Sequence, residues 1–207
     1  MSTIIYTIGH SNHTLDHFIG LLRQHEIEVL CDVRSTPASR YTPQFNAGTL
    51  EHVLPDHGIA YEFLGKQLGA RANDPNCYVG GKVHYGRLAA TPAFQEGLAH
   101  VEQVALVRTS VLMCAEKDPL ACHRTILVSR RLADRGADIR HILEDGRIET
   151  HDEAVRRLRE QLGMADDDLF RSPDDIVAEA YRVQGERIAY AMAQDGWEPA
   201  VANEDPA

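Results

Sequence analysis

The stretch that decides the fold is VLMCAEKDPLACHR, residues 111–124. Its apolar beginning continues a β-type run from about Thr109 and is typical of a buried strand that ends at Cys114. A carboxylate, a second thiol, an imidazole and a guanidinium follow within a few residues, at Glu116, Cys122, His123 and Arg124. Side chains capable of chemistry therefore crowd the junction that follows this strand.

A helix is expected to begin at this junction. Asp118 is a typical N-cap residue and Pro119 is favoured at the first helical position, so we predict a helix from Pro119 to about Gly136. Cys122 and His123 would lie in its first turn, where free N–H groups and the helix dipole favour a thiolate and bound anions. This placement predicts that Cys122 is the more reactive thiol, with a pKa below the usual value of about 8.5.

Strand and helix patterns alternate along the rest of the chain. The predicted strands cover residues 3–8, 27–34, 59–64, 109–114 and 137–143. The predicted helices cover about residues 14–24, 50–54, 92–101, 119–136, 150–163 and 172–194. This alternation predicts an α/β fold with a mainly parallel sheet and helices on both faces, a Rossmann-like three-layer arrangement, plus a C-terminal helical extension.

The chain divides by composition after Gly163. From Ala165 onward, eleven acidic side chains stand against three arginines, so this segment alone contributes −8 of the net charge of −10. We predict that residues 1–164 form the α/β domain that carries the site, and that residues 165–207 form an acidic linker, a helix and a frayed tail. The first segment is expected to fold without the second.

Composition also limits the partners and the compartment. The chain has 207 residues and four cysteines at irregular spacing, which is unlike a secreted disulfide framework. No apolar run reaches the roughly 18 residues of a membrane span, and the N-terminus lacks a signal-peptide pattern. We expect a cytoplasmic protein with reduced thiols. No basic run supports a nucleic-acid partner, and the apolar stripe of the last helix leaves a homo-oligomer open.

Polar residues follow three of the predicted strands. In parallel sheets with crossover helices, the carboxyl ends of the strands meet at one edge, where ligands bind. The residues at these ends are His10 and Ser11, Asp32 and Arg34, and Cys114 and Glu116. We predict that they converge with Arg124. The irregular segment 65–90, which holds Arg71, is typical of a lid or binding loop.

The residue types suggest roles. A thiolate beside a helix N-terminus is a nucleophile, carboxylates and imidazoles transfer protons, and arginines bind anions through paired donors. The candidate catalytic residues are Cys122, Cys114, Glu116 and His10. The candidate substrate-binding residues are Ser11, Asp32, Arg34, Arg71 and Arg124, with Asp32 orienting an arginine.

Metal and cofactor sites were weighed against this thiol chemistry. The spacing of Cys114, Cys122 and His123 matches no common zinc pattern, and adjacent residues on a helix point about 100° apart, so no metal is predicted. There is no Gly-x-Gly-x-x-Gly after the first strand, no Walker loop, no Gly-x-Ser-x-Gly elbow and no phosphatase Cys–Arg spacing. No motif therefore implies a cofactor.

Three motifs in order resemble a known family. They are Thr7-Ile-Gly-His-Ser11, Asp32-Val-Arg34 with Pro37 and Ser39, and the run from Cys114 to Arg124. Together they are similar to the domain-of-unknown-function 488 family, over roughly residues 4–160. The resemblance implies a compact α/β domain found in bacteria and archaea, and it implies no established activity.

The leading hypothesis is an enzyme that acts on an anionic, nucleotide-like small molecule, with a cysteine-dependent transferase or hydrolase favoured. One alternative is a binding module that recognises a nucleotide or a nucleic-acid end without turnover. The other is a thiol redox or metal-responsive protein that uses Cys114 and Cys122.

Overall fold

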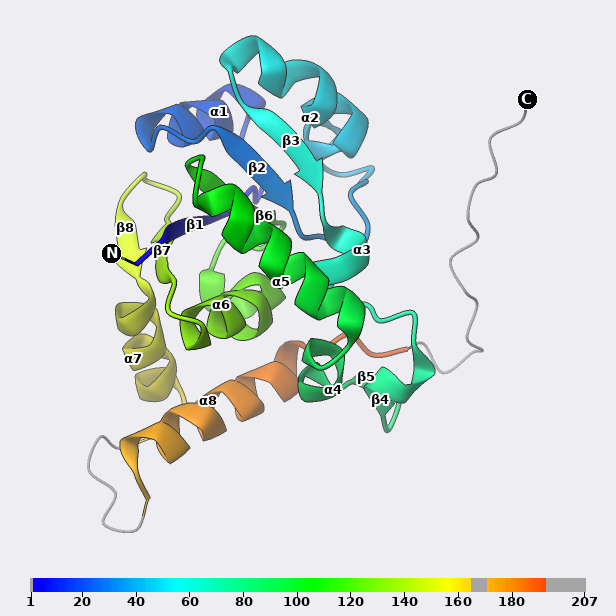
Figure 1. Cartoon of the computed structure of the whole chain (residues 1–207), viewed down its shortest axis with the longest axis vertical. Coiled ribbons are helices and arrows are strands. Elements are labelled where there is room, and N and C mark those ends of the chain that lie inside the picture. The colour runs from blue at the N-terminus through cyan, green and yellow to red at the C-terminus, as the bar shows by residue number, and fades with distance from the viewer. Residues whose placement is uncertain (1, 165–170, 193–207) are drawn as a thin grey trace.

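The protein is built on one six-stranded sheet. The computed structural model describes residues 2–164 and 171–192. The strand order is β3-β2-β6-β1-β7-β8 (Figure 1). The strands are β1 (Ile4–Gly9), β2 (Val29–Asp32), β3 (Ala60–Phe63), β6 (Ser110–Cys114), β7 (Asp138–Ile142) and β8 (Ile148–Thr150). The first five run parallel, and β8 pairs antiparallel with β7.

Helices cover both faces of this sheet. One face packs on α1 (Leu15–Gln24), η1 (Pro43–Phe45), α2 (Ala47–Val53) and η2 (Leu54–His57), and the other on α5 (Pro92–Ala105) and α6 (Arg130–Asp134). Side-chain alternation along β2 explains the two cores, because Leu30 belongs to the first and Cys31 to the second. The predicted three-layer α/β fold is confirmed. The order of the strands, with β6 between β2 and β1, is not the Rossmann order.

The predicted helix from Pro119 to Gly136 is wrong in its first turns. The chain instead makes the 3₁₀ turn η4 (Pro119–Ala121), is extended at Cys122 with φ −133° and ψ 143°, and then forms the π-helix η5 (Arg124–Ser129) before α6. Asp118 does cap, by accepting from the N–H of Leu120, but it caps only the short turn. Cys122 therefore precedes the helix instead of lying in it.

The segment 65–90 has more structure than its sequence predicts. It contains α3 (Gly65–Leu68), η3 (Pro75–Cys77), the hairpin of β4 (Tyr78–Val79) and β5 (Lys82–Val83), and α4 (Tyr85–Ala89). These elements are too short to give a periodic pattern. The short antiparallel β8 escapes prediction for the same reason.

The C-terminal helices pack against the domain. The two predicted C-terminal helices are present: a capping box of Thr150 and Glu153 starts α7 (His151–Gln161), and α8 (Pro173–Ile188) follows. In Figure 1, α8 crosses beneath α6 and reaches α4. Two of its buried residues, Ala180 and Tyr181, belong to a third apolar cluster with Leu120, Ile126, Ala154 and Leu158. Among the described residues, no helix is long and apolar enough to cross a membrane. The predicted acidic linker at residues 166–168 and the predicted frayed tail from Gly196 to Ala207 lie outside the described residues.

A buried chain of polar side chains ties these helices to the sheet. Thr7 Oγ1 contacts His141 Nδ1 at 2.8 Å, His141 Nε2 contacts His151 Nδ1 at 3.1 Å, and His151 Nε2 contacts the Tyr181 hydroxyl at 2.8 Å. Burial lowers the pKa of His151 to about 4 and that of His141 well below its usual value. Both imidazoles are therefore neutral in the folded protein at pH 7.

We predict that acid weakens the fold through this chain. The unfolded state binds a proton at His151 near pH 6.5 and the folded state only near pH 4, so stability falls as the pH drops through this window. For His151 the loss is about 3 kcal/mol. Urea unfolding between pH 7 and pH 4 measures it. The His151→Gln variant should lose stability less steeply than the wild type, and identical slopes would exclude His151 as the cause.

Candidate functional site

The carboxyl ends of β1, β2 and β6 form one edge of the sheet. Beyond the strands the pairing continues, because the N–H of His10 donates to the Cys114 carbonyl and that of Ser11 to the Ala115 carbonyl, both at 2.9 Å. Gly9 makes this close approach feasible: a Cβ there would stand 1.9 Å from the carbonyl oxygen of Glu116. Gly9 is thus needed because the backbone after β1 lies directly against the backbone after β6.

Asp32 and Arg34 form a buried ion pair at the end of β2. The guanidinium donates to the Asp32 carboxylate through Nε at 2.9 Å and Nη2 at 2.6 Å, and Nη2 also donates to the carbonyl of Phe45. The hydroxyl of Tyr61 donates to the same carboxylate at 2.8 Å. As predicted from the sequence, Asp32 orients the arginine.

His10 supports this arginine from the other side. Its Nδ1 contacts the carbonyl of Ser11 at 2.9 Å, which makes it the protonated nitrogen, and its Nε2 then accepts from Arg34 Nη1 at 3.1 Å. The ring stacks on Phe45. Burial lowers the pKa of His10 to about 4, so the ring is neutral. Both nitrogens are engaged, and His10 positions Arg34 instead of serving as the proton-transfer group that the sequence suggested.

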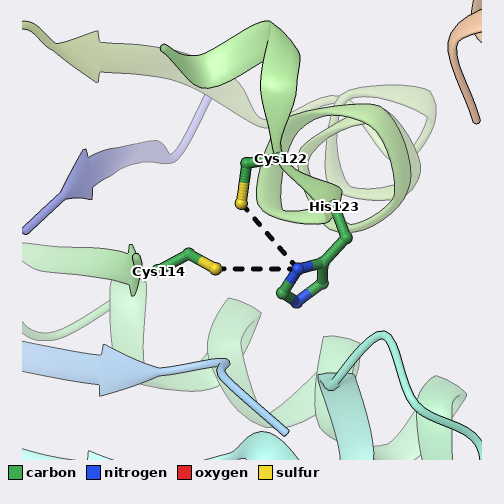
Figure 2. Close-up of side chains that lie close together, drawn as sticks. All are labelled: Cys114, Cys122 and His123. Atoms are coloured by element: carbon green, nitrogen blue, oxygen red, sulfur yellow. Dashed lines mark hydrogen bonds between the residues drawn. The ribbon is translucent and has the colours of Figure 1, made fainter. Parts of the chain in front are cut away.

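Cys114, Cys122 and His123 form a second cluster, which we call the thiol–imidazole cluster. Figure 2 shows both sulfurs pointing at the same ring nitrogen, His123 Nδ1, from 3.6 Å and 3.8 Å. His123 Nε2 contacts the carbonyl of Val33 at 3.0 Å. A carbonyl accepts only, so Nε2 carries the proton in the neutral ring and the Nδ1 lone pair faces the sulfurs.

The two thiols differ in acidity. The hydrogen bond to Cys122 raises the pKa of Cys114, and burial adds to this. Burial opposes ionisation of Cys122 as well, but the hydrogen bond from Cys114, the charge of Arg124 and the contact with His123 outweigh it and lower its pKa. The backbone N–H of Arg124 also donates to the Cys122 sulfur at 3.4 Å. The direction agrees with the sequence prediction, although the causes are the contacts with Cys114, Arg124 and His123 and not a place in a helical first turn.

The thiol–imidazole cluster faces a pocket of about 310 Å³ at this edge, which we call the rim pocket. Its walls include Arg34, Ser35, Thr36, Arg71, Tyr85, Glu116, Ile188 and Tyr190. Two arginines, one exposed carboxylate and the cluster thus share one cavity. The guanidinium of Arg71 lies over the ring of Tyr190, which follows α8. The C-terminal extension therefore completes the wall.

The comparisons with known proteins agree with the motifs. The family model described as domain of unknown function DUF488 matches residues 14–131, more than half of the chain. The chain belongs to the DUF488 family. The match is shorter than the predicted 4–160 and begins after the Thr7–Ser11 motif, but it includes the ion pair and the whole thiol–imidazole cluster. No curated protein and no solved structure matches the chain.

Four candidate residues of this DUF488 domain are not among the walls of the rim pocket: His10 and Asp32, which hold Arg34, and also Arg124 and Ser11. Arg124 is 0% exposed, and its guanidinium donates to the carbonyls of Glu116 and Lys117 at 2.6 Å and 3.2 Å. It holds the loop that follows β6 and does not reach an anion in the pocket. Ser11 adopts a left-handed backbone with φ 49° and is half-buried outside the pocket walls. We therefore withdraw Arg124 and Ser11 as anion-binding residues.

The sequence does not reveal the part of His123 or the aromatic walls of the rim pocket. His123 was set aside because a helix would turn it away from Cys122, and the extended backbone at Cys122 removes that objection. Tyr85 and Tyr190 reach the pocket from α4 and from the segment after α8, 105 residues apart in the numbering. No local sequence pattern could have predicted that these two tyrosines share a pocket, because their proximity depends on how α8 packs against the domain.

Proposed function

We propose that this protein is an enzyme that acts on an anionic small molecule bound in the rim pocket. The observation that carries the proposal is the joining of a cationic wall, formed by Arg34 and Arg71, to the thiol–imidazole cluster in one cavity. A wall of guanidinium groups binds phosphate or carboxylate, and a polarised thiol or imidazole beside it supplies the reactive group. Glu116, exposed on the same cavity, is the proposed proton-transfer residue.

The two arginines have different parts in this proposal. Arg34 is held on three sides by Asp32, His10 and the Phe45 carbonyl, and one Nη1 hydrogen has no acceptor within the described chain. A fixed guanidinium with a spare donor favours a defined orientation of the ligand, because little side-chain entropy is lost on binding. Arg71 is exposed and rests on Tyr190, so it is the more adaptable contact.

The setting is proposed from the same features. All four cysteines are free and buried, which agrees with a cytoplasmic protein whose thiols stay reduced. A nucleotide-like ligand is proposed within the anionic class, since two aromatic residues, Tyr85 and Tyr190, line the pocket and aromatic rings can stack on a base.

We predict that Arg71→Ala weakens anion binding about tenfold or more, because a hydrogen bond to a charged group contributes about 1.5–3 kcal/mol. Calorimetric titration with inorganic phosphate and with a nucleoside monophosphate measures the change. Arg87→Ala is the matched control: Arg87 is exposed, lies in the same segment and donates to the Asn76 carbonyl outside the pocket. Equal affinities in both variants would place the anion elsewhere.

Turnover separates the enzyme from a binding module. The full chain is incubated with a panel of phosphomonoesters, nucleotides and small carboxylic acids, and the small molecules are analysed by mass spectrometry. We expect a product that disappears in Cys114→Ala and Cys122→Ala but persists in Cys77→Ala. Binding without any product across the panel would favour the binding module and overturn the proposal of an enzyme.

A further inference from the structure

Two sulfur atoms lie close to the single lone pair of His123 Nδ1. Two sulfurs point at one nitrogen, whose single lone pair can accept from only one thiol at a time. All three donor atoms lie within 4.8 Å of one another, and all three residues are buried. Two sulfur donors and one imidazole nitrogen that lie this close together can bind a single metal ion.

The spacing of the donors fits a tetrahedral ion. With Zn–S near 2.3 Å and Zn–N near 2.0–2.1 Å, two ligands at the tetrahedral angle leave sulfur and nitrogen about 3.6 Å apart. The structure has sulfur–nitrogen distances of 3.6 Å and 3.8 Å. Both sulfur–nitrogen distances are therefore those of a tetrahedral site, and the sulfurs lie within 4.8 Å of each other, against about 3.8 Å in such a site.

The surroundings match those of a metal-binding histidine. Ligating imidazoles donate their other N–H to a carbonyl or carboxylate, which fixes the ring and its tautomer. His123 does this through Nε2 to the carbonyl of Val33 at 3.0 Å. The N–H of Arg124 donates to the Cys122 sulfur, as backbone amides do to a ligand thiolate. Both contacts are made by backbone atoms, so they orient the ligand side chains for metal binding without help from a neighbouring side chain.

We propose that Cys114, Cys122 and His123 bind one soft divalent cation, with Zn²⁺ the best match, and leave its fourth position open to the rim pocket. Thiolate and imidazole donors select zinc over magnesium or calcium, and three protein ligands with an open position are typical of catalytic zinc. The inference rests on the proposed function in one respect: it takes the rim pocket as the reaction site. A bound cation makes both sulfurs ligands, and it polarises the group at the fourth position.

The experiment is a metal titration of the full chain, reduced and freed of metal with a chelator. We expect one equivalent of Zn²⁺ to bind, and one of Co²⁺ to give a thiolate charge-transfer band with the intense visible bands of tetrahedral cobalt. Cys114→Ala, Cys122→Ala and His123→Ala should each weaken Zn²⁺ binding by more than about 100-fold, since even losing a second-shell partner costs about 10- to 100-fold. Cys77→Ala, a buried cysteine outside the cluster, is the control and should bind normally.

A second measurement does not depend on the variants folding. The wild-type chain is alkylated with and without Zn²⁺, and the labelled cysteines are mapped by mass spectrometry. We expect Zn²⁺ to protect Cys114 and Cys122 alone. Substoichiometric binding, binding that survives in all three variants, or equal labelling with and without Zn²⁺ overturns the inference.

The two proposals fail separately. The phosphate titration is repeated on the metal-free chain and on Arg71→Ala. If zinc does not bind but phosphate binds and depends on Arg71, the metal inference falls and the proposed function keeps a thiol as its reactive group. If zinc binds as expected but phosphate and the nucleotide do not, the cluster is a metal site and the anionic substrate is wrong.

Discussion

Asp32→Ala is expected to lower the free energy of unfolding by about 3–5 kcal/mol, as breaking a buried ion pair does. The carboxylate is 0% exposed and accepts from the Arg34 side chain, the Arg34 backbone and the Tyr61 hydroxyl. Its removal leaves the guanidinium charge of Arg34 buried without a partner of opposite sign. Urea unfolding at pH 7 measures the loss.

The chain contains a matched control for this pair. Asp138 and Arg140 are also two residues apart on a strand and pair at 2.8 Å, but both side chains are more than one-third exposed. Asp138→Ala should therefore cost less than about 1 kcal/mol, because solvent screens exposed pairs. If the two variants lose equal stability, burial is not what makes Asp32 important. Asp32→Ala should also weaken phosphate binding, since Arg34 loses its fixed orientation.

The sequence predicts most of this fold because the apolar residues of each strand and helix recur with a local period. In β2, Leu30 and Cys31 alternate between two apolar cores. Thr14, Thr91 and Thr150, a residue type that favours N-caps, cap α1, α5 and α7. Strand order is not a local property. It depends on which face each crossover helix covers, so the insertion of β6 between β2 and β1 left no pattern to read.

The candidate site was predictable where strand ends supply it and unpredictable where the backbone is irregular. The meeting of Asp32, Arg34 and Cys114 follows from parallel strands with a common edge. The roles of Arg124 and His10 did not follow, because a sequence does not show which side chains will form hydrogen bonds to backbone carbonyls. The π-helix η5 likewise left no recognisable pattern: within it, Ser129 Oγ donates to the Arg124 carbonyl at 2.7 Å and competes with the backbone N–H groups for that acceptor.

The division at residue 164 stays a prediction, and the packing of α8 argues against independent folding. We now expect a chain of residues 1–164 to lose several kcal/mol or to unfold. Truncation uncovers Leu120, Ile126 and Leu158, which pack with α8 in the third apolar cluster. Burying each large apolar side chain contributes about 1.5–3 kcal/mol, and whole domains are stable by only about 5–15 kcal/mol. The truncation also removes Tyr190 and Ile188 from the walls of the rim pocket.

Single substitutions in α8 measure how much individual residues of this helix contribute to stability. Tyr181→Ala should cost about 3–5 kcal/mol, because the buried ring packs in the third cluster, whereas Tyr181→Phe should cost only about 1 kcal/mol for the hydroxyl bond to His151. Arg182→Ala, next along the helix and more than half exposed, should change stability by less than about 0.5 kcal/mol. Unfolding of each variant in urea, compared with the 1–164 chain, decides the matter. A truncated chain that unfolds cooperatively at the wild-type midpoint, together with a neutral Tyr181→Ala, would show that α8 is an appendage and that the α/β domain is complete at residue 164.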